Sequence, residues 1–292
     1  MRGDAHAHQL LAPGNLASVL QLLADEPGQW TPIAGGTELM VAYAAGRLNI
    51  AKLVNLWGIS ELRFIETKPD SITIGAGTTF TDLRHSAIVT EELSLLDKAA
   101  GWIGAIANQN RATIGGNLVN GSPAADSSPA LLVYDAEIEL SSVRGNRRVP
   151  YCEFHTGYKQ NVMAADELLY AIHLPRRFAG HTQYIRKVGP RRAQAISKVA
   201  LAATAAVHEC VINEIRLAAA SLAPYPTRLR QTESVLVGAP ITTETIRAAQ
   251  SALLREAQPI DDIRSTAEYR RRVGANLLEE FLRKLIPSGD AG

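Results

Sequence analysis

Two glycine pairs constrain the fold of this chain more than any other feature of its sequence. They lie in residues 34–39 (AGGTEL), the first glycine loop, and in residues 112–117 (ATIGGN), the second glycine loop. Glycine has no Cβ, so the backbone can bend sharply there and present its N–H groups to a ligand. Successive N–H groups in such a turn form a concave site for anions. Two such sites, brought together by folding, predict a pyrophosphate with a nucleotide on either side.

Glycine pairs are also common in ordinary turns, and this chain has 22 glycines. A single pair is better explained as a structural turn. Two pairs flanked by hydroxyl, amide or carboxylate side chains indicate more, because these groups bond phosphate and ribose; the flanking residues are Thr37, Glu38, Thr113 and Asn117. A third motif, residues 75–80 (GAGTTF), begins like a dinucleotide fingerprint, but Phe80 is too bulky for its third small position. We expect that motif to be a strand end.

Composition narrows the function further. The 292 residues are 46% hydrophobic, which is enough for a large core and more than one domain. With 30 basic and 29 acidic residues the net charge is +1, so nothing points to nucleic acid or a membrane surface. The two cysteines, Cys152 and Cys210, belong to no paired pattern and supply no usual iron–sulfur or zinc ligand set. We assign no catalytic residue and no metal ligand, since no Ser-His-Asp or Cys-His arrangement is evident.

The amino-terminal residues contain no apolar signal-like stretch, and no long apolar span follows. The sequence therefore predicts a cytoplasmic protein without membrane insertion.

Local patterns predict alternating helices and strands. Asn15 is a suitable N-cap for a helix over residues 16–24, and a strand over 30–33, a helix over 37–45 and a strand over 52–56 follow. This β-turn-α-β unit places the first glycine loop at a helix start, where the helix dipole favours anions. Further strands are expected at 71–74, 137–141, 148–151 and 168–174, and further helices at 81–87, 94–107, 130–134, 243–256 and 267–285. Alanine density predicts a helix over residues 193–209, although Val199 and Thr204 would fit a strand equally well.

Two charged features have more than one interpretation. Asp126 lies beside a helix start and is either a capping carboxylate or an acceptor for ribityl or ribose hydroxyls. Lys187, with Arg191 and Arg192, is either part of a solvated turn or a cationic contact to a flavin or its phosphates. Residue identity alone does not decide between these alternatives.

Four segments in order along the chain resemble the FAD-binding subunits of molybdenum hydroxylases, which include xanthine dehydrogenase and the aerobic carbon monoxide dehydrogenase medium subunit. The segments are AGGTEL, ATIGGNLVNGSPAADSSPALLVYDAEIEL, DELLYAIHLP and YIRKVGPRRAQAISKVALAA. Residues 261–270 (DDIRSTAEYR) are similar to the second domain of that family, and residues 154–157 with the chain length resemble its bacterial xanthine dehydrogenase type.

The resemblance implies an α+β fold. Residues 1–177 would form a two-subdomain FAD-binding domain of the PCMH type, with subdomains of about 1–57 and 58–177. Residues 178–292 would form a C-terminal domain with a small antiparallel sheet and helices, like that of CO dehydrogenase flavoproteins. In such a domain residues 193–209 are largely strand, against the propensity of their alanines.

The resemblance also implies which residues bind FAD. In the first glycine loop and its flank these are Ile33, Ala34, Gly35, Gly36, Thr37, Glu38 and Leu39. Opposite them would lie Ala112, Thr113, Gly116 and Asn117. Asp126 would hold FAD hydroxyls, Leu169 would pack near the isoalloxazine ring, Lys187 would lie beside the flavin, and Ile103 would replace an aromatic contact to the adenine.

The function implied by the resemblance is electron transfer within a multi-subunit complex. Molybdopterin would sit on a large partner subunit and [2Fe-2S] clusters on a small one, with FAD on this chain and NAD⁺ or another acceptor receiving the electrons. No protein acid or base is needed at the flavin, because the cofactor carries the chemistry. A stand-alone flavin oxidoreductase and a non-catalytic scaffold subunit are the alternatives.

Overall fold

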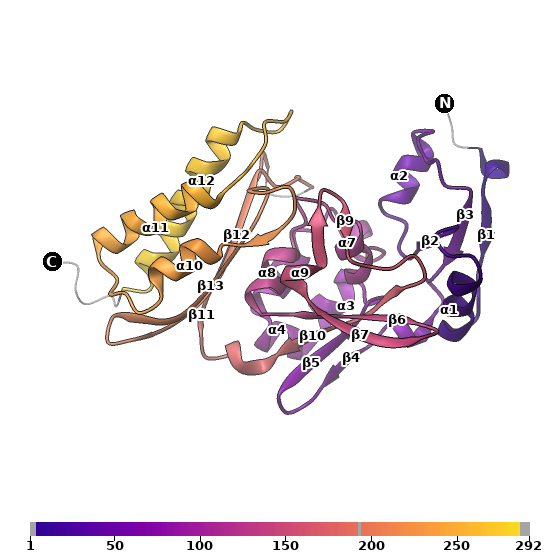
Figure 1. Cartoon of the computed structure of the whole chain (residues 1–292), viewed down its shortest axis with the longest axis horizontal. Coiled ribbons are helices and arrows are strands. Elements are labelled where there is room, and N and C mark those ends of the chain that lie inside the picture. The colour runs from indigo at the N-terminus through magenta and orange to yellow at the C-terminus, as the bar shows by residue number, and fades with distance from the viewer. Residues whose placement is uncertain (1–3, 192–193, 287–292) are drawn as a thin grey trace.

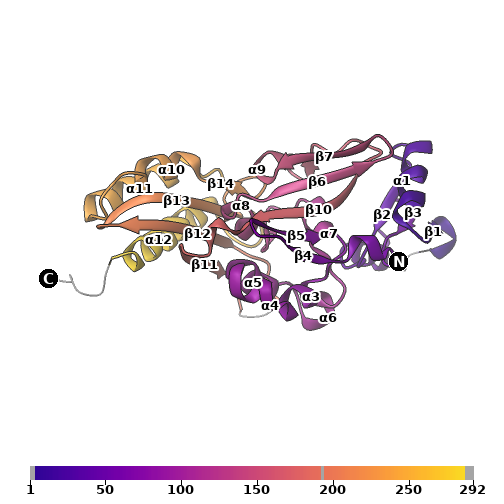
Figure 2. The same ribbon diagram turned by 90° about the horizontal axis from the view of Figure 1, so that it is seen from below.

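The computed structural model describes residues 4–191 and 194–286, and its helices and strands form three regions along the long axis of the molecule (Figure 1). The amino-terminal region lies at one end, a region built on a larger sheet lies in the middle, and the carboxy-terminal region lies at the other end (Figures 1 and 2). Each region has its own sheet. The mixture of helices and mostly antiparallel sheets is the expected α+β class.

The first region is a small parallel sheet with a helix on either side of the first glycine loop. Its strand order is β1 (Gln9–Leu11), β3 (Lys52–Asn55), β2 (Trp30–Ile33), and its helices are α1 (Leu16–Asp25) and α2 (Leu39–Ala44). The side chain of Asn15 caps α1 by accepting the Ser18 N–H at 2.9 Å. Buried leucine and valine side chains of α1 pack against Trp30 and Val54. The β2–loop–α2–β3 segment is therefore the β-turn-α-β unit that the sequence predicts.

The middle region is an antiparallel sheet of five strands with helices along one face. The strand order is β4 (Ile65–Thr67), β5 (Ser71–Gly75), β10 (Leu168–Pro175), β6 (Glu137–Ser142), β7 (Gly145–Pro150). Its helices are α3 (Phe80–His85), α4 (Ala87–Glu92), α5 (Ser94–Ala100), α6 (Ile106–Gln109), α7 (Ile114–Val119), α8 (Ser128–Val133) and α9 (Tyr151–Phe154). A two-strand hairpin, β8 (His155–Gly157) and β9 (Gln160–Asn161), follows α9. Alternate strand residues such as Ile72, Ile138 and Ile172 join the helices in one core.

The last region is a second antiparallel sheet covered by three helices. The sheet runs β11 (Thr182–Val188), β12 (Val199–His208), β13 (Val211–Ala220), β14 (Thr227–Arg228), and the helices are α10 (Arg230–Leu236), α11 (Thr243–Glu256) and α12 (Ala267–Lys284). Short 3-10 turns lie at Ala5–Ala7, Ser60–Leu62 and Arg176–Phe178.

The helix predicted from alanine content over residues 193–209 is wrong, since the described part of that segment is dominated by strand β12. The reason is burial on both faces of the sheet. Ala200 and Ala202 lie on the face packed by α8, and Leu201 and Ala203 contribute to the core shared with α12. Small side chains allow helices to approach the strand closely from both sides, and this tertiary packing overrides helix propensity.

Two other helix predictions are too long. The helix expected over 94–107 ends at Ala100, and the chain turns through Gly104, whose φ of +50° interrupts helical geometry before α6. The helix expected over 81–87 ends at His85, with extended backbone at Ser86 before α4 begins. The first break matters for the site, because Ile103 lies within it.

The divisions expected near residues 57 and 177 stay predictions. The middle and last regions pack closely, since Ile185, Ala202 and Ala218 share a core cluster with the middle sheet. No helix in the described ranges has both the length and the apolar character needed to cross a membrane.

Candidate functional site

A cleft of about 500 Å³ opens between the two glycine loops, at the junction of the first and middle regions. Every residue that the resemblance assigns to FAD lines this cleft except Asp126 and Lys187. The lining thus includes the whole of Ile33 to Leu39, the second glycine loop apart from Ile114, Ile103 from the break after α5, and Leu169 near the start of β10. Its volume falls in the range of roughly 300–1,000 Å³ typical of cofactor and ligand sites.

The two glycine loops meet through a backbone contact that only glycine permits. A Cβ built on Gly35 would lie 1.8 Å from the carbonyl oxygen of Arg111, directly before the second glycine loop. The Arg111 side chain makes a second contact. Its guanidinium carbon lies 3.7 Å from the ring centroid of Trp57, which follows β3. These contacts fix the separation of the two sides of the cleft.

The first glycine loop leaves its backbone N–H groups open. No acceptor among the described residues receives a hydrogen bond from the N–H groups of residues 35–39. Gly36 has a φ of +73°, a conformation that suits glycine and turns the chain into α2. A run of unpaired N–H groups around a left-handed residue matches the anion site that the sequence predicts here.

The second glycine loop is different, because the fold already uses its N–H groups. Those of Ile114 and Gly115 donate to the carbonyls of Thr78 and Ala76, and the Gly116 N–H donates to the Thr113 hydroxyl at 3.1 Å. The Asn117 N–H donates to the Thr113 carbonyl. Gly115 is required for packing, since a Cβ there would lie 2.6 Å from that of Ala76. The sequence predicts an anion site in each loop. In the structure the first glycine loop has open N–H groups, whereas those of residues 114–117 in the second are already bonded within the protein.

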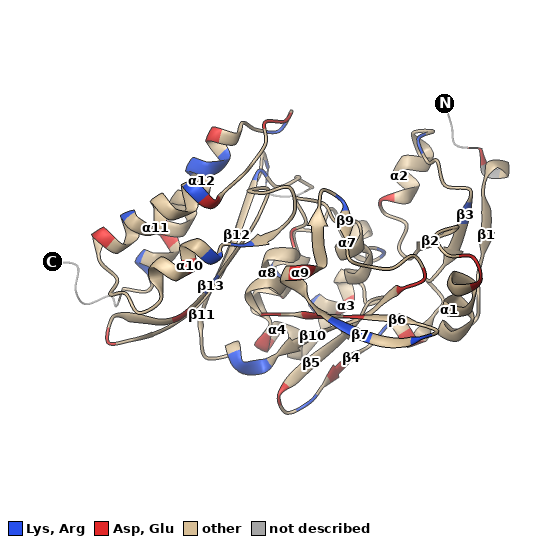
Figure 3. Cartoon of the chain, in the orientation of Figure 1, with Lys and Arg blue, Asp and Glu red and all other residues tan. Residues whose placement is uncertain are grey.

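The cleft wall is mostly uncharged. Among the described lining residues, the ionisable ones are Glu38 and Glu167. Arg147 holds Glu167 from behind through two hydrogen bonds of 2.6 and 2.8 Å, and this pairing lowers the pKa of the Glu167 carboxyl. In Figure 3, α7 beside the cleft carries no charged residue, whereas blue and red residues are frequent on the C-terminal helices.

Asp126 and Lys187 form a buried ion pair beside the cleft. Lys187 Nζ donates to Asp126 Oδ2 at 2.5 Å, and the two side chains are only 9–10% exposed. Asp126 Oδ1 is buried without a partner among the described groups. Burial raises the pKa of Asp126 to about 6, and the attraction of Lys187 offsets only part of that rise. The capping interpretation of Asp126 is not supported, since no backbone N–H of the described residues donates to its carboxylate and Ser127 occupies the N-cap of α8.

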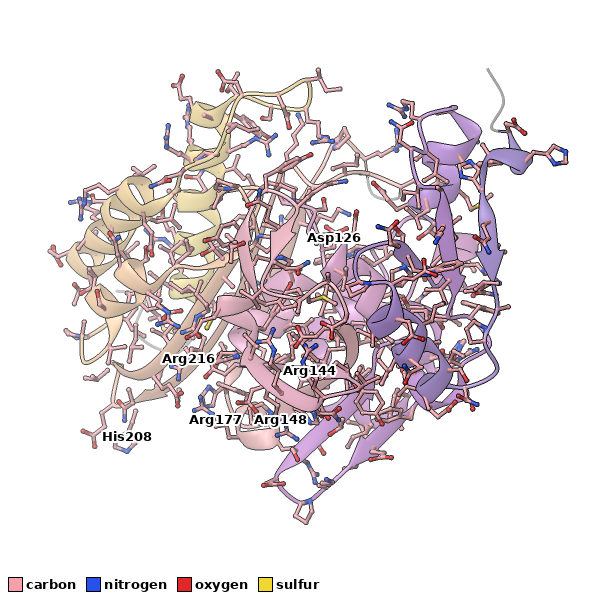
Figure 4. The ribbon with its side chains drawn as sticks, turned by 45° about the vertical axis from the view of Figure 1, so that its right-hand side comes forward. Asp126, Arg144, Arg148, Arg177, His208 and Arg216 are labelled. Atoms are coloured by element: carbon pink, nitrogen blue, oxygen red, sulfur yellow. The ribbon has the colours of Figure 1, made fainter. Side chains whose placement is uncertain are left out.

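Two contacts connect this pair to the cleft. Lys187 Nζ also donates to the carbonyl of Trp102, the neighbour of the cleft residue Ile103. The Ser127 hydroxyl, next to Asp126, donates to Asn117 Oδ1 at 2.7 Å. Figure 4 shows Asp126 near the middle of the molecule, well apart from the labelled Arg144, Arg148, Arg177 and Arg216. Asp126 Oδ1 thus has an unused capacity to accept a hydrogen bond beside the cleft.

Several residues that line the cleft were not among those predicted to bind FAD. Those with polar or flexible side chains are Thr31, Asn108, Asn120, Met163 and Glu167. Glu167 could have been predicted, because it lies in the DELL segment two residues before Leu169. The rest carry no local signal, since only the folding of distant segments brings them to the cleft.

Of the basic group named with Lys187, Arg192 lies outside the described residues, while Arg191 donates to the Gln194 carbonyl at 2.6 Å. In the portions of the chain that the structure describes, no three His, Cys, Asp or Glu side chains are grouped as a metal site would require.

Comparisons with known proteins match both parts of the chain. Residues 6–177 match the family model of the FAD binding domain in molybdopterin dehydrogenase, and residues 184–285 match the CO dehydrogenase flavoprotein C-terminal domain. The chain is 34% identical over 273 residues to the xanthine dehydrogenase FAD-binding subunit of Escherichia coli O157:H7, covering 93% of this chain and 92% of that protein. It is 29% identical to the nicotinate dehydrogenase FAD-subunit of Eubacterium barkeri, with 89% of each chain covered.

A solved structure shows the same fold. It is a carbon monoxide dehydrogenase from Hydrogenophaga pseudoflava that lacks the Mo-pyranopterin moiety of the molybdenum cofactor. One of its chains superimposes with a TM-score of 0.90 at 26% identity, covering 94% of this chain and 96% of that one.

Proposed function

Because this chain belongs to the FAD-binding subunits of the molybdenum hydroxylase family, we propose that it is the electron-transfer subunit of a heteromeric complex. A large subunit would carry molybdopterin and the substrate site, and a small subunit would carry [2Fe-2S] clusters. Electrons would pass from those clusters through FAD on this chain to NAD⁺ or another acceptor. We further propose that the holoenzyme acts on xanthine or a related purine, since the similarity to a xanthine dehydrogenase subunit is 34%.

The observation that carries the proposal is the fit of this cleft to FAD. The first glycine loop offers open N–H groups for the phosphates, and the close approach at Gly35 keeps the opposite wall within reach. The orphaned Asp126 Oδ1 offers an acceptor for a ribityl or ribose hydroxyl. Leu169 and Ile103 provide apolar surface for flat rings.

When bound, FAD supplies the exchange between one-electron and two-electron chemistry that joins iron–sulfur clusters to a hydride acceptor. The protein groups bind and orient it. Lys187 brings a positive charge from strand β11 to the flavin end, and Asp126 holds that ammonium in place. The substrate is transformed elsewhere in the complex, so this cleft needs no general acid or base.

The experiment is purification of the full chain and of its complex. The full chain should show a flavin spectrum and reduce a dye with NADH, without hydroxylating xanthine. The complex should contain molybdenum and reduce NAD⁺ with xanthine faster than with nicotinate. Xanthine hydroxylation by this chain alone would refute the electron-transfer role, and a chain that binds no FAD in the complex would be the scaffold instead. Faster turnover of nicotinate would refute the purine assignment.

A further inference from the structure

The ionisable residues that line the cleft have the same sign of charge as the phosphates of FAD. An FAD pyrophosphate carries two negative charges at neutral pH, whereas the described ionisable residues in the lining are both carboxylates, Glu38 and Glu167. Arg147 neutralises Glu167 from outside the cleft. Lys187 is engaged with Asp126 beside the cleft. A cation near Glu38 would therefore offset this negative charge and add to the attraction of the open N–H groups for the phosphates.

Lys159 lies where its side chain can supply this positive charge. Its Nζ lies 3.3 Å from Glu38 Oε1 in the first glycine loop and 3.5 Å from Asn120 Oδ1, directly after α7. Both of those residues line the cleft. The Lys159 side chain thus spans the rim between the two sides of the site.

The backbone holds Lys159 at this position. It occupies the tight turn between β8 and β9 with a φ of +54°, a left-handed conformation that is unfavourable for lysine. A Cβ on Gly121, itself at φ +59°, would lie 3.1 Å from the Lys159 Cα, so the turn is packed against the end of α7. Tight two-residue hairpin turns commonly require a positive φ, so the turn itself fixes the backbone of Lys159 and the point from which its side chain extends.

We propose that Lys159 binds the FAD pyrophosphate, exchanging its contacts with Glu38 and Asn120 for phosphate oxygens. This inference rests on the proposed FAD site. The present ion pair is a weak one, because Lys159 is 43% exposed and Glu38 is 62% exposed, so it is easily exchanged. An ammonium-to-phosphate hydrogen bond is charge-assisted and stronger.

The test measures flavin dissociation constants of the full chain after removal of bound flavin. Lys159→Gln should bind FAD about tenfold more weakly, the loss expected for one charge-assisted hydrogen bond, and should bind riboflavin as wild type does. Its FAD affinity should also depend less on salt. Lys159→Arg should restore affinity and salt dependence. Lys68→Gln, at the exposed tip of the β4–β5 hairpin, is the matched control and should bind FAD as wild type does.

A double variant separates phosphate binding from simple neutralisation of Glu38. If Lys159 contacts phosphate, Lys159→Gln should weaken FAD binding by a similar factor in a Glu38→Gln background. If its only role is to neutralise Glu38, the double variant should bind FAD as tightly as Glu38→Gln alone, and the proposal is overturned. An unchanged FAD affinity in Lys159→Gln, or an equal loss for riboflavin, would also overturn it. Failure of the wild-type chain to bind FAD would instead overturn the proposed function.

Discussion

Gly35 and Arg111 touch backbone to backbone, although 76 positions of sequence numbering separate them: a Cβ on Gly35 would lie 1.8 Å from the Arg111 carbonyl oxygen and 2.4 Å from its carbonyl carbon. This contact joins the parallel sheet of the first region to the segment that leads into the second glycine loop. The width of the cleft follows from it.

Gly35→Ala should separate the two loops. Neither atom that the new methyl group meets belongs to a flexible side chain, so the backbone must move, at a cost of at least about 1–3 kcal/mol. We expect a lower thermal unfolding midpoint and an FAD dissociation constant at least about tenfold higher. Gly14→Ala is the control, because a Cβ at Gly14 meets nothing within 4 Å. Equal FAD affinity and stability in the two variants would contradict this account of the cleft.

Asp126→Asn should uncouple stability from cofactor binding. Asparagine keeps an oxygen that can accept from Lys187 but removes a buried charge, so the unfolding free energy of the FAD-free chain at pH 7.5 should not fall by more than about 1 kcal/mol. The FAD dissociation constant should rise about tenfold, because a carboxylate bonded to a hydroxyl is lost. Titration of both variants with FAD measures this, and Glu137→Gln, at a half-exposed carboxylate on β6, should change neither property. An affinity like that of wild type would exclude a role for the Asp126 charge.

The pH dependence of stability should report the same carboxyl group. Burial raises the pKa of Asp126 from 3.8 to about 6 in the folded chain. Between those values the folded state keeps a proton that the unfolded state has lost, so the Asp126 contribution to stability falls as pH rises through the window and is constant above it. The unfolding free energy of wild type minus that of Asp126→Asn should fall by up to about 3 kcal/mol between pH 4 and pH 7. Urea unfolding at several pH values measures the difference; a difference that rises with pH would show that the ion pair dominates over burial.

Arg270 should be important for the stability of the last region. It is 3% exposed, and its guanidinium donates to the carbonyl of Lys198 at 3.0 Å and to Asp262 at 2.7 Å. Arg270→Met should lower the unfolding free energy by about 3 kcal/mol, because these buried acceptors lose their donor. Arg272→Met, on the exposed side of α12, should change it by no more than about 0.5 kcal/mol. Chemical denaturation of both variants gives the comparison, and similar losses would mean that the buried contacts of Arg270 contribute little.

Local sequence patterns predicted the elements whose causes are local. The Asn15 cap and apolar spacing define α1, the same spacing gives α11 its bounds at Thr243–Glu256, and the turn at Gly145 joins β6 to β7. The resemblance to the FAD-binding subunits of molybdenum hydroxylases is confirmed by the family matches and by the superposition with a carbon monoxide dehydrogenase chain. The residue-by-residue assignments to FAD stay predictions, although the structure gathers most of them in one cleft.

The sequence by itself determined where two glycine pairs let another segment come close, because the absence of a Cβ is a property of each residue alone. The first pair also turns the chain, with Gly36 at a φ of +73°, whereas Gly115 and Gly116 lie in helix α7 without a positive φ. Only the tertiary structure decided what each loop does. Residues 76–78 pair with the second glycine loop and use its N–H groups, whereas the described residues leave those of the first loop open. Likewise, the alanine-rich segment of β12 forms a strand because helices pack on both faces of its sheet. Folding also brings Lys187 next to Asp126, 61 positions earlier in the sequence. These outcomes depend on contacts between distant segments, which no local pattern contains.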